Sequence, residues 1–369
     1  MPGTRRTHLP TALAAVLVLC LSSLAGAAEF GIDRKRAPAV HSAVPHSAMS
    51  YSVGRSALDL WSAAQLARPR GQTLAAAERH IRSLAQPDLS PPARVQPQQP
   101  APALTPALAG IIRRVRSSER GQPEHARPTV ALTFDLCERA VHVTGYDADL
   151  VDALRAAGAR ATFFAGGKWM RSHPERTQQL MADPRFEMAS HAWTHANMAV
   201  APAEEQERQI SWTSAQFELL REDLDRRLAE RGLPASGVGP LRLFRLPYGR
   251  GNAETAARLN RHGLAVIQWD VVGEGGVGSA EQRARAIVSA VRPGSIILLH
   301  ANAIPKDTAA IVRHLLPLLA SKGYATATVS ELLASGTPET CPEGFFTTPG
   351  DNEIYDSMFR GYGTLGRAQ

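Results

Sequence analysis

Two histidines four residues apart, His191 and His195, lie in the stretch SHAWTHANM, and their imidazole nitrogens could bind one divalent metal ion. A spacing of four places two side chains on one face of a helix, so we expect both rings on one helical turn. Such a pair alone is weak evidence, because exposed helices often contain it. The metalloprotease motif needs a glutamate directly after the first histidine, and Ala192 stands there.

The elements that must position these histidines follow from the hydrophobic pattern. From Pro128 onward, short apolar runs alternate with helix-like stretches. The expected strands are 129–135, 159–165, 186–192, 243–249, 264–270, 294–300 and 325–331. The expected helices are 147–157, 171–183, 203–232, 253–263, 279–291 and 307–321. This alternation predicts an α/β domain with parallel strands, and it favours a distorted (β/α)7-type barrel.

Polar side chains stand at the carboxyl ends of the expected strands. They are Asp135, His191, Tyr248, Asp270 and His300. Barrel enzymes carry their chemistry at that end, since each strand holds its last side chain firmly while the following loop shapes the pocket. One such residue could cap the next helix, but five of these types together indicate an active site.

Four motifs occur in a fixed order: TFDLCE (133–138), HAWTH (191–195), RLPYG (245–249) and LLH (298–300). In order and spacing they resemble the polysaccharide deacetylases, the NodB-homology family that forms carbohydrate esterase family four. The resemblance covers roughly residues 128–335. It implies a distorted barrel that removes N-acetyl or O-acetyl groups from a carbohydrate polymer with a metal-activated water.

The resemblance also implies roles for single residues. Asp135 matches the catalytic base, and Arg245 matches the arginine that pairs with it. Tyr248 matches the residue whose backbone N–H faces the developing oxyanion. His300 matches the general acid. Leu298, two residues earlier on the same strand, is expected to form the bottom of the pocket that holds the acetyl methyl group.

The chain departs from the family pattern in the first motif. The family has Asp-Asp there, and its second aspartate binds the metal with the two histidines, but Leu136 occupies that place. We expect Glu138 to supply the third ligand, with Cys137, Asp135 itself or water as the alternatives. The expected ion is Zn²⁺, with Co²⁺ or Ni²⁺ as alternatives.

A second departure follows QWD, in the stretch QWDVVGEGG. The family commonly has an Asp-Trp pair beyond this point, which orients the acid and walls the acetyl pocket. We expect Glu274 to replace that aspartate as the partner of His300, which raises the pKa of the histidine. We expect Trp269 or Trp193 to supply the wall from another direction, with a more open pocket as the alternative.

The N-terminus carries the features of a secretory signal peptide over residues 1–28. Arg5 and Arg6 precede an apolar run that closes with small residues, and cleavage is expected after Ala27 or Ala28. The protein is therefore expected to be exported to the periplasm or the extracellular space. Cleavage also removes Cys20.

Export affects the interpretation of the cysteines that remain, Cys137 and Cys341. In an oxidising compartment an even pair favours a disulfide bond, which would tie the C-terminal tail to the TFDLCE loop. The alternatives are two separate buried thiols, or Cys137 as a thiolate ligand of the metal.

Composition divides the rest of the chain. Residues 29–126 read as a Pro/Gln/Ala-rich extension and linker that is partly helical around Trp61, 127–336 as the catalytic domain, and 337–369 as a tail. The formal net charge is +7. No basic stripe with interleaved aromatics accompanies it, so a nucleic-acid partner is not expected. No second long apolar stretch predicts a membrane span.

The sequence thus favours an exported metal-dependent deacetylase whose partner is a carbohydrate polymer. One alternative is a glycan-binding protein on the same scaffold, with its chemistry lost at Leu136. The other is a hydrolase of a non-glycan amide. An open groove would favour polymers, and a closed pocket would favour the smaller substrate.

Overall fold

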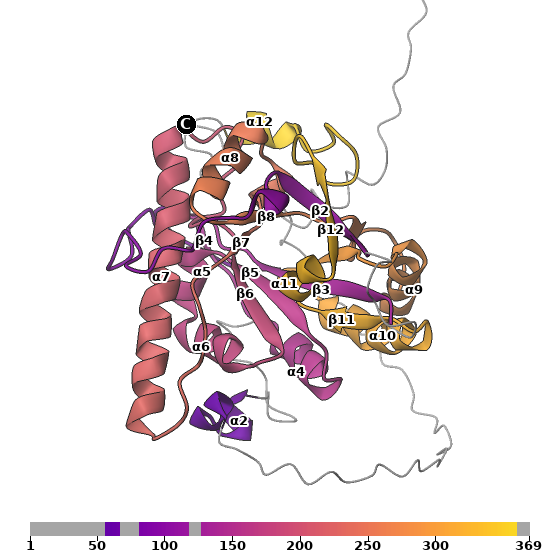
Figure 1. Cartoon of the computed structure of the whole chain (residues 1–369), viewed down its shortest axis with the longest axis horizontal. Helices are drawn as coiled ribbons and strands as arrows, with labels where there is room; N and C mark the ends of the chain where they lie inside the picture. The colour runs from indigo at the N-terminus through magenta and orange to yellow at the C-terminus, as the bar shows by residue number, and fades with distance from the viewer. Residues whose placement is uncertain (1–55, 67–80, 118–126, 360–369) are drawn as a thin grey trace, which may run out of the picture.

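A ten-stranded sheet lies at the centre of the computed structural model, which describes residues 56–66, 81–117 and 127–359 (Figure 1). In spatial order its main path is β12 (Gly336–Cys341), β2 (Ile111–Ser117), β8 (Ala265–Ile267), β7 (Leu243–Phe244), β6 (Phe186–Ser190), β5 (Ala161–Ala165), β3 (Thr129–Leu136), β10 (Ile296–His300) and β9 (Val271–Val272). The tenth strand, β11 (Ala325–Ala327), pairs with β3 beside this path.

Seven of these strands, from β2 round to β10, form a distorted and incompletely closed barrel. Each of the six neighbouring pairs along this path is parallel. The seam between β2 and β10 is held by an isolated bridge from Arg114 to Ser295 and by the Val115 N–H, which donates to the Gly294 carbonyl at 3.0 Å. A Cβ at Gly294 would lie 1.5 Å from the Val115 oxygen, so only glycine permits this approach. The predicted barrel class is confirmed.

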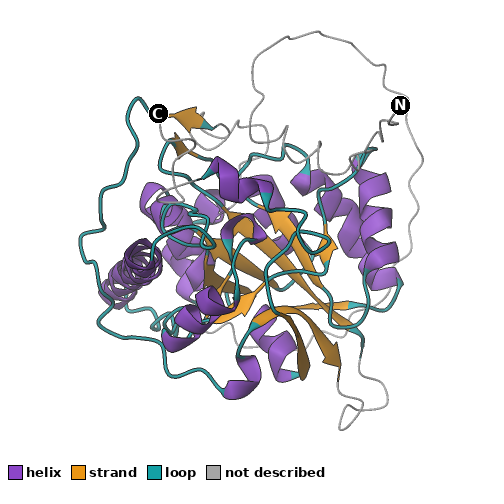
Figure 2. Cartoon of the chain, turned by 90° about the horizontal axis from the view of Figure 1, so that it is seen from above, coloured by secondary structure: helices purple, strands orange, loops and turns teal. Residues whose placement is uncertain are grey.

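Helices cover the outside of the barrel (Figure 2). They are α4 (Ala148–Ala156), α5 (Gly167–Ser172), α6 (Pro174–Ala182), α7 (Ala203–Glu230), α8 (Ala253–Arg261), α9 (Ala280–Ala290), α10 (Thr308–Ser321) and α11 (Val329–Ala334). Side-chain caps define several starts: Asp147 accepts from the Leu150 N–H, and Ser279 forms a capping box with Gln282. Within the described ranges, no helix is both long and apolar enough to cross a membrane.

Three expected elements divide in the structure. In the stretch 243–249, β7 ends at Phe244 and a 3-10 turn follows over Pro247–Gly249. The stretch 171–183 contains a break at His173, because Pro174 lacks an N–H to continue α5 and instead occupies the first position of α6. The stretch 325–331 holds only β11 before α11 begins, since Thr328 caps that helix through a hydrogen bond from the Glu331 N–H.

Two strands of the main sheet reach beyond the predicted domain boundaries, one at each end. Strand β2 lies inside the presumed extension 29–126, and β12 begins the presumed tail 337–369, yet the two pair antiparallel as part of the main sheet (Figure 1). Each run is short and mixes apolar with charged residues. Its strand character therefore comes from its distant partner rather than from its own pattern.

The Pro/Gln-rich segment is not a loose linker where it is described. Arg94 forms an ion pair with Glu218 of α7 at 2.7 Å, and the same carboxylate accepts the backbone N–H groups of Gln98 and Gln99 at 2.6 and 2.7 Å. Further upstream, Trp61 donates from its ring nitrogen to Glu175 of α6 at 2.9 Å. The predicted signal peptide, residues 1–28, lies outside the described residues.

Candidate active site

The carboxyl ends of the strands surround one cavity of about 190 Å³. All of the catalytic and oxyanion positions expected from the sequence except Arg245 line it directly, together with both histidines of the HAWTH motif. Asp135 and His300 are register partners on β3 and β10, so the parallel pairing itself sets the expected base and the expected acid side by side. Asp270 is not part of the cavity lining. It accepts hydrogen bonds from the Ser295 hydroxyl and the Ile296 N–H, so its role is structural.

Asp135 and Arg245 form a buried ion pair, as predicted. One guanidinium nitrogen lies 2.8 Å from Asp135 Oδ1, and the arginine is fully buried. The remaining N–H groups of Arg245 donate to the carbonyls of Ile267 and Gln268. Because these contacts fix the guanidinium, the arginine holds the carboxylate in one orientation and stabilises its charge.

The two histidines of the HAWTH motif meet with their ring centroids 4.7 Å apart. His191 Nδ1 lies 3.0 Å from the Arg245 carbonyl, and since a carbonyl can only accept, this nitrogen carries the proton. In the neutral ring, Nε2 of His191 then carries the lone pair, and this nitrogen lies 3.5 Å from Asp135 Oδ2. Nε2 of His191 and Nδ1 of His195 are both buried without a hydrogen-bond partner among the described residues.

The expected helical turn at this motif is wrong. Residues 191–198 form a loop after β6, and it contains two non-glycine residues with positive φ, Ala192 at 64° and His195 at 58°. These left-handed residues turn the chain back on itself, which brings the rings together without a helix. Such backbone costs on the order of 1 kcal/mol per residue and is typical of functional sites.

Glu138 does not face the histidines, so the expectation that it binds the metal is wrong. Its carboxylate lies 2.6 Å from Lys168 Nζ in a fully buried ion pair. It also accepts from the Ser172 hydroxyl at 2.6 Å and the Thr144 N–H at 2.9 Å. With these three donors the carboxylate is saturated, and it anchors the loop after β3 to α5.

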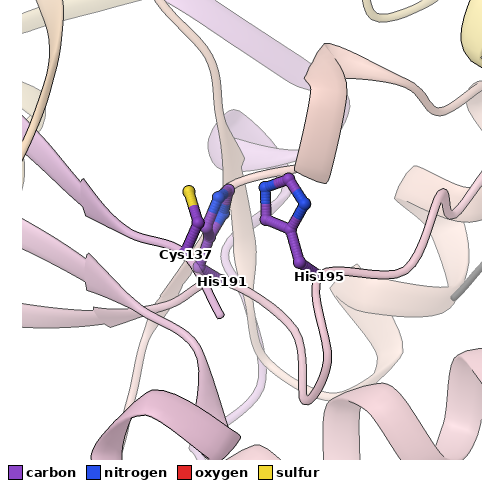
Figure 3. Close-up of side chains that lie close together, drawn as sticks. All are labelled: Cys137, His191 and His195. Atoms are coloured by element: carbon purple, nitrogen blue, oxygen red, sulfur yellow. The ribbon is translucent and has the colours of Figure 1, made fainter. Parts of the chain in front are cut away.

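Cys137 occupies the position that Glu138 was expected to fill. Its sulfur and one nitrogen of each of His191 and His195 all lie within 4.8 Å of one another (Figure 3). Side chains of an extended strand alternate, so Asp135 and Cys137 share one face while Glu138 lies on the other. Burial disfavours the thiolate, but the charges of His195 and His191 outweigh it and lower the pKa of Cys137 well below the usual thiol value.

The predicted disulfide is not formed, because both Cys137 and Cys341 are free. Cys341 stands opposite Ile111 in the pairing of β12 with β2, and its sulfur donates to the Glu343 carbonyl at 3.0 Å. The pairing of the edge strand β12 thus holds Cys341 at the edge of the sheet, whereas Cys137 faces the cavity.

Glu274 is the partner of His300, as predicted. Its Oε2 lies 2.5 Å from Nδ1 of the histidine. Oε1 accepts the His300 backbone N–H at 2.8 Å and the Thr308 hydroxyl. Burial disfavours the imidazolium, but the charge of Glu274 more than offsets it and raises the pKa of His300 well above its usual value. The protonated form required of a general acid is therefore favoured.

Leu298 and Trp269 both line the cavity, as expected. The ring nitrogen of Trp269 donates to the Phe346 carbonyl at 2.9 Å, which fixes the indole. Trp193 is not a wall residue. It packs edge-on against Trp212 at 5.8 Å, and a Cβ at Gly167 would lie 2.3 Å from its ring. Trp193 thus contributes to the core between α5 and α7.

The C-terminal segment contributes a wall of the cavity that the sequence analysis missed. Phe346, Tyr355, Met358 and Phe359 line it, and the last three lie in or directly after α12 (Ile354–Met358). The Tyr248 ring stacks on Phe359 and Tyr355, with centroid distances of 4.5 and 4.9 Å. The spacing of four between Tyr355 and Phe359 was the available signal, because it puts both rings on one side of a helical turn.

Polar contacts fasten this wall to the catalytic loops. Asn352 donates to the Tyr248 carbonyl at 2.8 Å, and Arg250 forms an ion pair with Asp356. Tyr248 itself has φ 59° and ψ 8°. The C-terminal segment thus helps to hold the left-handed backbone at the position whose N–H is predicted to face the oxyanion. That role of the N–H remains a prediction.

A carboxylate held by a buried arginine, a histidine held by a glutamate and paired imidazoles meet at the strand ends of a parallel barrel, which is an arrangement that could hydrolyse acyl groups. Residues 122–267 match the family described as polysaccharide deacetylase. This match covers most of the strands that carry the four motifs, and the resemblance seen in those motifs is confirmed.

Individual relatives are more distant. The chain is 28% identical over 187 residues to a chitooligosaccharide deacetylase of Azorhizobium caulinodans, covering 47% of this chain and 81% of the relative. It is 26% identical over 209 residues to a chitooligosaccharide deacetylase of Sinorhizobium fredii, covering 53% and 88%. A solved peptidoglycan N-acetylglucosamine deacetylase superposes with a TM-score of 0.49 at 18% identity, covering 63% of this chain and 96% of that one.

Proposed function

We propose that the chain is an exported, metal-dependent polysaccharide deacetylase that hydrolyses N-acetyl groups, with O-acetyl esters as related substrates. One observation carries the proposal: in a single cavity, the pairs Asp135–Arg245 and His300–Glu274 accompany two buried imidazole nitrogens without hydrogen-bond partners. A general base, a general acid and a site for an electrophile are the parts that amide hydrolysis needs.

His191 and His195 fit a divalent ion. Each presents a buried nitrogen with no partner among the described residues, and a buried polar atom in that state is unfavourable unless something binds it. Imidazole donors favour Zn²⁺, with Co²⁺ and Ni²⁺ as weaker candidates. When bound, such an ion supplies Lewis acidity at the acyl oxygen and lowers the pKa of water.

The chain's own groups then move the protons. Asp135 accepts a proton from the attacking water, and Arg245 holds its carboxylate in place throughout. The Tyr248 N–H donates to the oxygen on which negative charge develops. His300 gives its proton to the leaving nitrogen, so that an amine departs rather than an amide anion, and Glu274 keeps that proton available.

The substrate class and the location rest on different support. Relatives named chitooligosaccharide deacetylases favour N-acetylated sugar oligomers as substrates. Export rests on the sequence of residues 1–28 alone, with its arginine pair, apolar run and small residues before the expected cleavage point.

The direct test uses the full mature protein, stripped of metal and then reloaded. We expect acetate release from N-acetylglucosamine oligomers with Zn²⁺ or Co²⁺, and none after chelation. Absence of release from every glycan tried, with metal bound stoichiometrically, would overturn the proposal. That outcome would favour a binding protein on the same scaffold, although the retained Asp135, Arg245 and His300 argue against lost chemistry.

A second candidate, hydrolysis of a non-glycan amide, is favoured by the wall that the C-terminal segment adds. Phe346, Tyr355 and Phe359 make one side of the cavity apolar, and sites for small molecules are typically concave and lined mostly by apolar and aromatic side chains. Comparing kcat/KM for small aryl acetamides with kcat/KM for N-acetylglucosamine oligomers decides between the two. A higher value for the oligomers supports the glycan.

A further inference from the structure

We propose that the thiolate of Cys137 is the third protein ligand of the metal, so that the site is built from two imidazoles and one sulfur. This inference rests on the proposed function, because it assigns a ligand to the metal on which that function depends. It replaces the carboxylate ligand of the family pattern with a softer donor at the next position along the chain. It also gives Leu136 and Glu138 structural roles only.

The first support is the direction of the side chains after β3. Leu136 is fully buried in the core, and its carbonyl accepts the Gly166 N–H at 3.1 Å. The residues on either side of it, Asp135 and Cys137, therefore share the face that lines the cavity. In this chain the Leu136 side chain lies in the core, whereas Cys137 lines the cavity.

The second support is the fixed position of the cysteine. The Cys137 carbonyl accepts from the Thr144 hydroxyl at 2.7 Å and from the Asn302 amide at 3.2 Å. The next residue, Glu138, is locked by the buried ion pair with Lys168 at 2.6 Å. A ligand held in this way loses little conformational freedom when it binds a metal. Hydrogen bonds that orient the ligands of a metal site act in this manner.

The third support is the convergence of donors. The His191 and His195 nitrogens are at least nine-tenths buried by residue and have no partner in the part of the chain that the structure describes. The Cys137 sulfur lies within 4.8 Å of both (Figure 3). Three protein donors leave a fourth tetrahedral position for water, as catalytic zinc sites require.

Asp135 does not compete for this position. Arg245 holds Oδ1 of Asp135 at 2.8 Å. The other oxygen, Oδ2, lies 3.5 Å from Nε2 of His191. The aspartate therefore remains available as the base. The sulfur also lies within 4.8 Å of one nitrogen of His300 and one oxygen of Asp135, so the ligand, the acid and the base surround one small volume.

A sulfur ligand changes which ion the site prefers. Thiolate favours Zn²⁺ and Co²⁺, whereas Mg²⁺ and Mn²⁺ prefer oxygen donors. We therefore expect the protein to take up Zn²⁺ in the presence of excess Mg²⁺. The Cys137→Asp variant exchanges the sulfur donor for an oxygen donor and keeps three donors. The excess of its Zn²⁺ affinity over its Mg²⁺ affinity should therefore be smaller than in the wild type.

The experiment follows the optical spectrum of the full mature protein loaded with Co²⁺, since thiolate ligation gives an intense sulfur-to-cobalt charge-transfer band in the near ultraviolet. The wild type and Cys341→Ser, which removes the other cysteine of the described chain, should both show the band. Cys137→Ser and Cys137→Asp should lack it. Zinc affinity, measured by chelator competition, should fall more than about 100-fold in Cys137→Ser, beyond the loss seen for outer supports.

Several results would overturn the inference. A wild type that binds one equivalent of Co²⁺ without the band would do so, as would a band that survives in both Cys137 variants. An acyl adduct on Cys137 during turnover would instead make it a nucleophile. Acetate release is measured on the same samples: a wild type with the band but no release on any glycan contradicts only the proposed function. If the wild type binds no Co²⁺, both proposals fail.

Discussion

Glu274 holds His300 at two points, with Oε2 2.5 Å from the ring Nδ1 and Oε1 2.8 Å from the backbone nitrogen of the same residue. A carboxylate that grips both the side chain and the main chain of a histidine fixes the ring direction and its protonation together. This contact is the basis for the first prediction.

Glu274→Gln should lower kcat by roughly 10- to 100-fold, because the acid loses its charged partner. The pKa of His300 lies well above its usual value in the wild type, so the protonated acid persists as pH rises. Without the carboxylate this pKa falls, and the alkaline limb of the kcat profile should move to lower pH. A pH–rate profile with an unmoved alkaline limb would contradict the assignment. Glu281→Gln, on the exposed face of α9, is the control.

Asp135→Asn should separate the base from the metal ligands. We expect kcat to fall by about 10²- to 10⁴-fold, the usual contribution of a positioned base. The affinity for Co²⁺ and the cobalt spectrum should change little, because Asp135 is held by Arg245 rather than by the ion. Spectral titration beside a steady-state assay checks both. Loss of cobalt binding in this variant would make Asp135 a ligand.

Asp147, the N-cap of α4, should make stability depend on pH. Burial raises its pKa from 3.8 to about 6, so its contribution to stability is fully present below the ordinary value and is lost as pH rises through about 6. Asparagine caps equally well without a charge. Asp147→Asn should therefore be more stable than the wild type by roughly 1–3 kcal/mol at pH 7.5 and equal to it near pH 4.

Denaturant unfolding at the two pH values measures this difference. Asp149→Asn, in the first turn of the same helix, is the matched control and should show no gain at the higher pH. Equal stability of Asp147→Asn and the wild type at both values would show that the buried carboxylate does not govern the transition.

Tyr355→Ala tests the C-terminal wall as a substrate surface. Its ring lies 4.9 Å from that of Tyr248 and faces the cavity. Removing it should raise KM by about 5-fold, since an aromatic contact contributes on the order of 1 kcal/mol, while kcat changes by less than about 3-fold. Ile354→Ala, which alters the exposed neighbour on α12, serves as the control. An equal rise in KM for both would indicate a general loosening of the segment.

The sequence predicted the parts of the site that depend on strand ends. Asp135 and His300 follow long apolar runs, and parallel pairing then places them together without further information. The partner Glu274 was also predictable, because a buried acid histidine needs a carboxylate and this one follows closely on QWD.

The parts that failed depend on local backbone conformation or on distant pairing. The left-handed φ of Ala192 and His195 has no signature in residue type, so the motif was expected as a helical turn. The length of the glutamate side chain favours Glu138 over Cys137 as a ligand, but the alternation of side chains along β3 puts Cys137 on the face of the cavity. The C-terminal wall depends on β12 pairing with β2, and neither short strand reveals its partner.

That pairing has a consequence for how the molecule is made. Arg114 of β2 forms an ion pair with Glu339 of β12, which lies 225 positions later in the chain. During synthesis, β2 can therefore pair with β12 only after β12 has emerged from the ribosome near the end of translation. The wall residues 346–359 come later still. The growing polypeptide therefore carries Asp135, His300 and both histidines of the HAWTH motif before it has the residues that complete the cavity. The pocket of this structure can thus form only after nearly the whole chain has been synthesised.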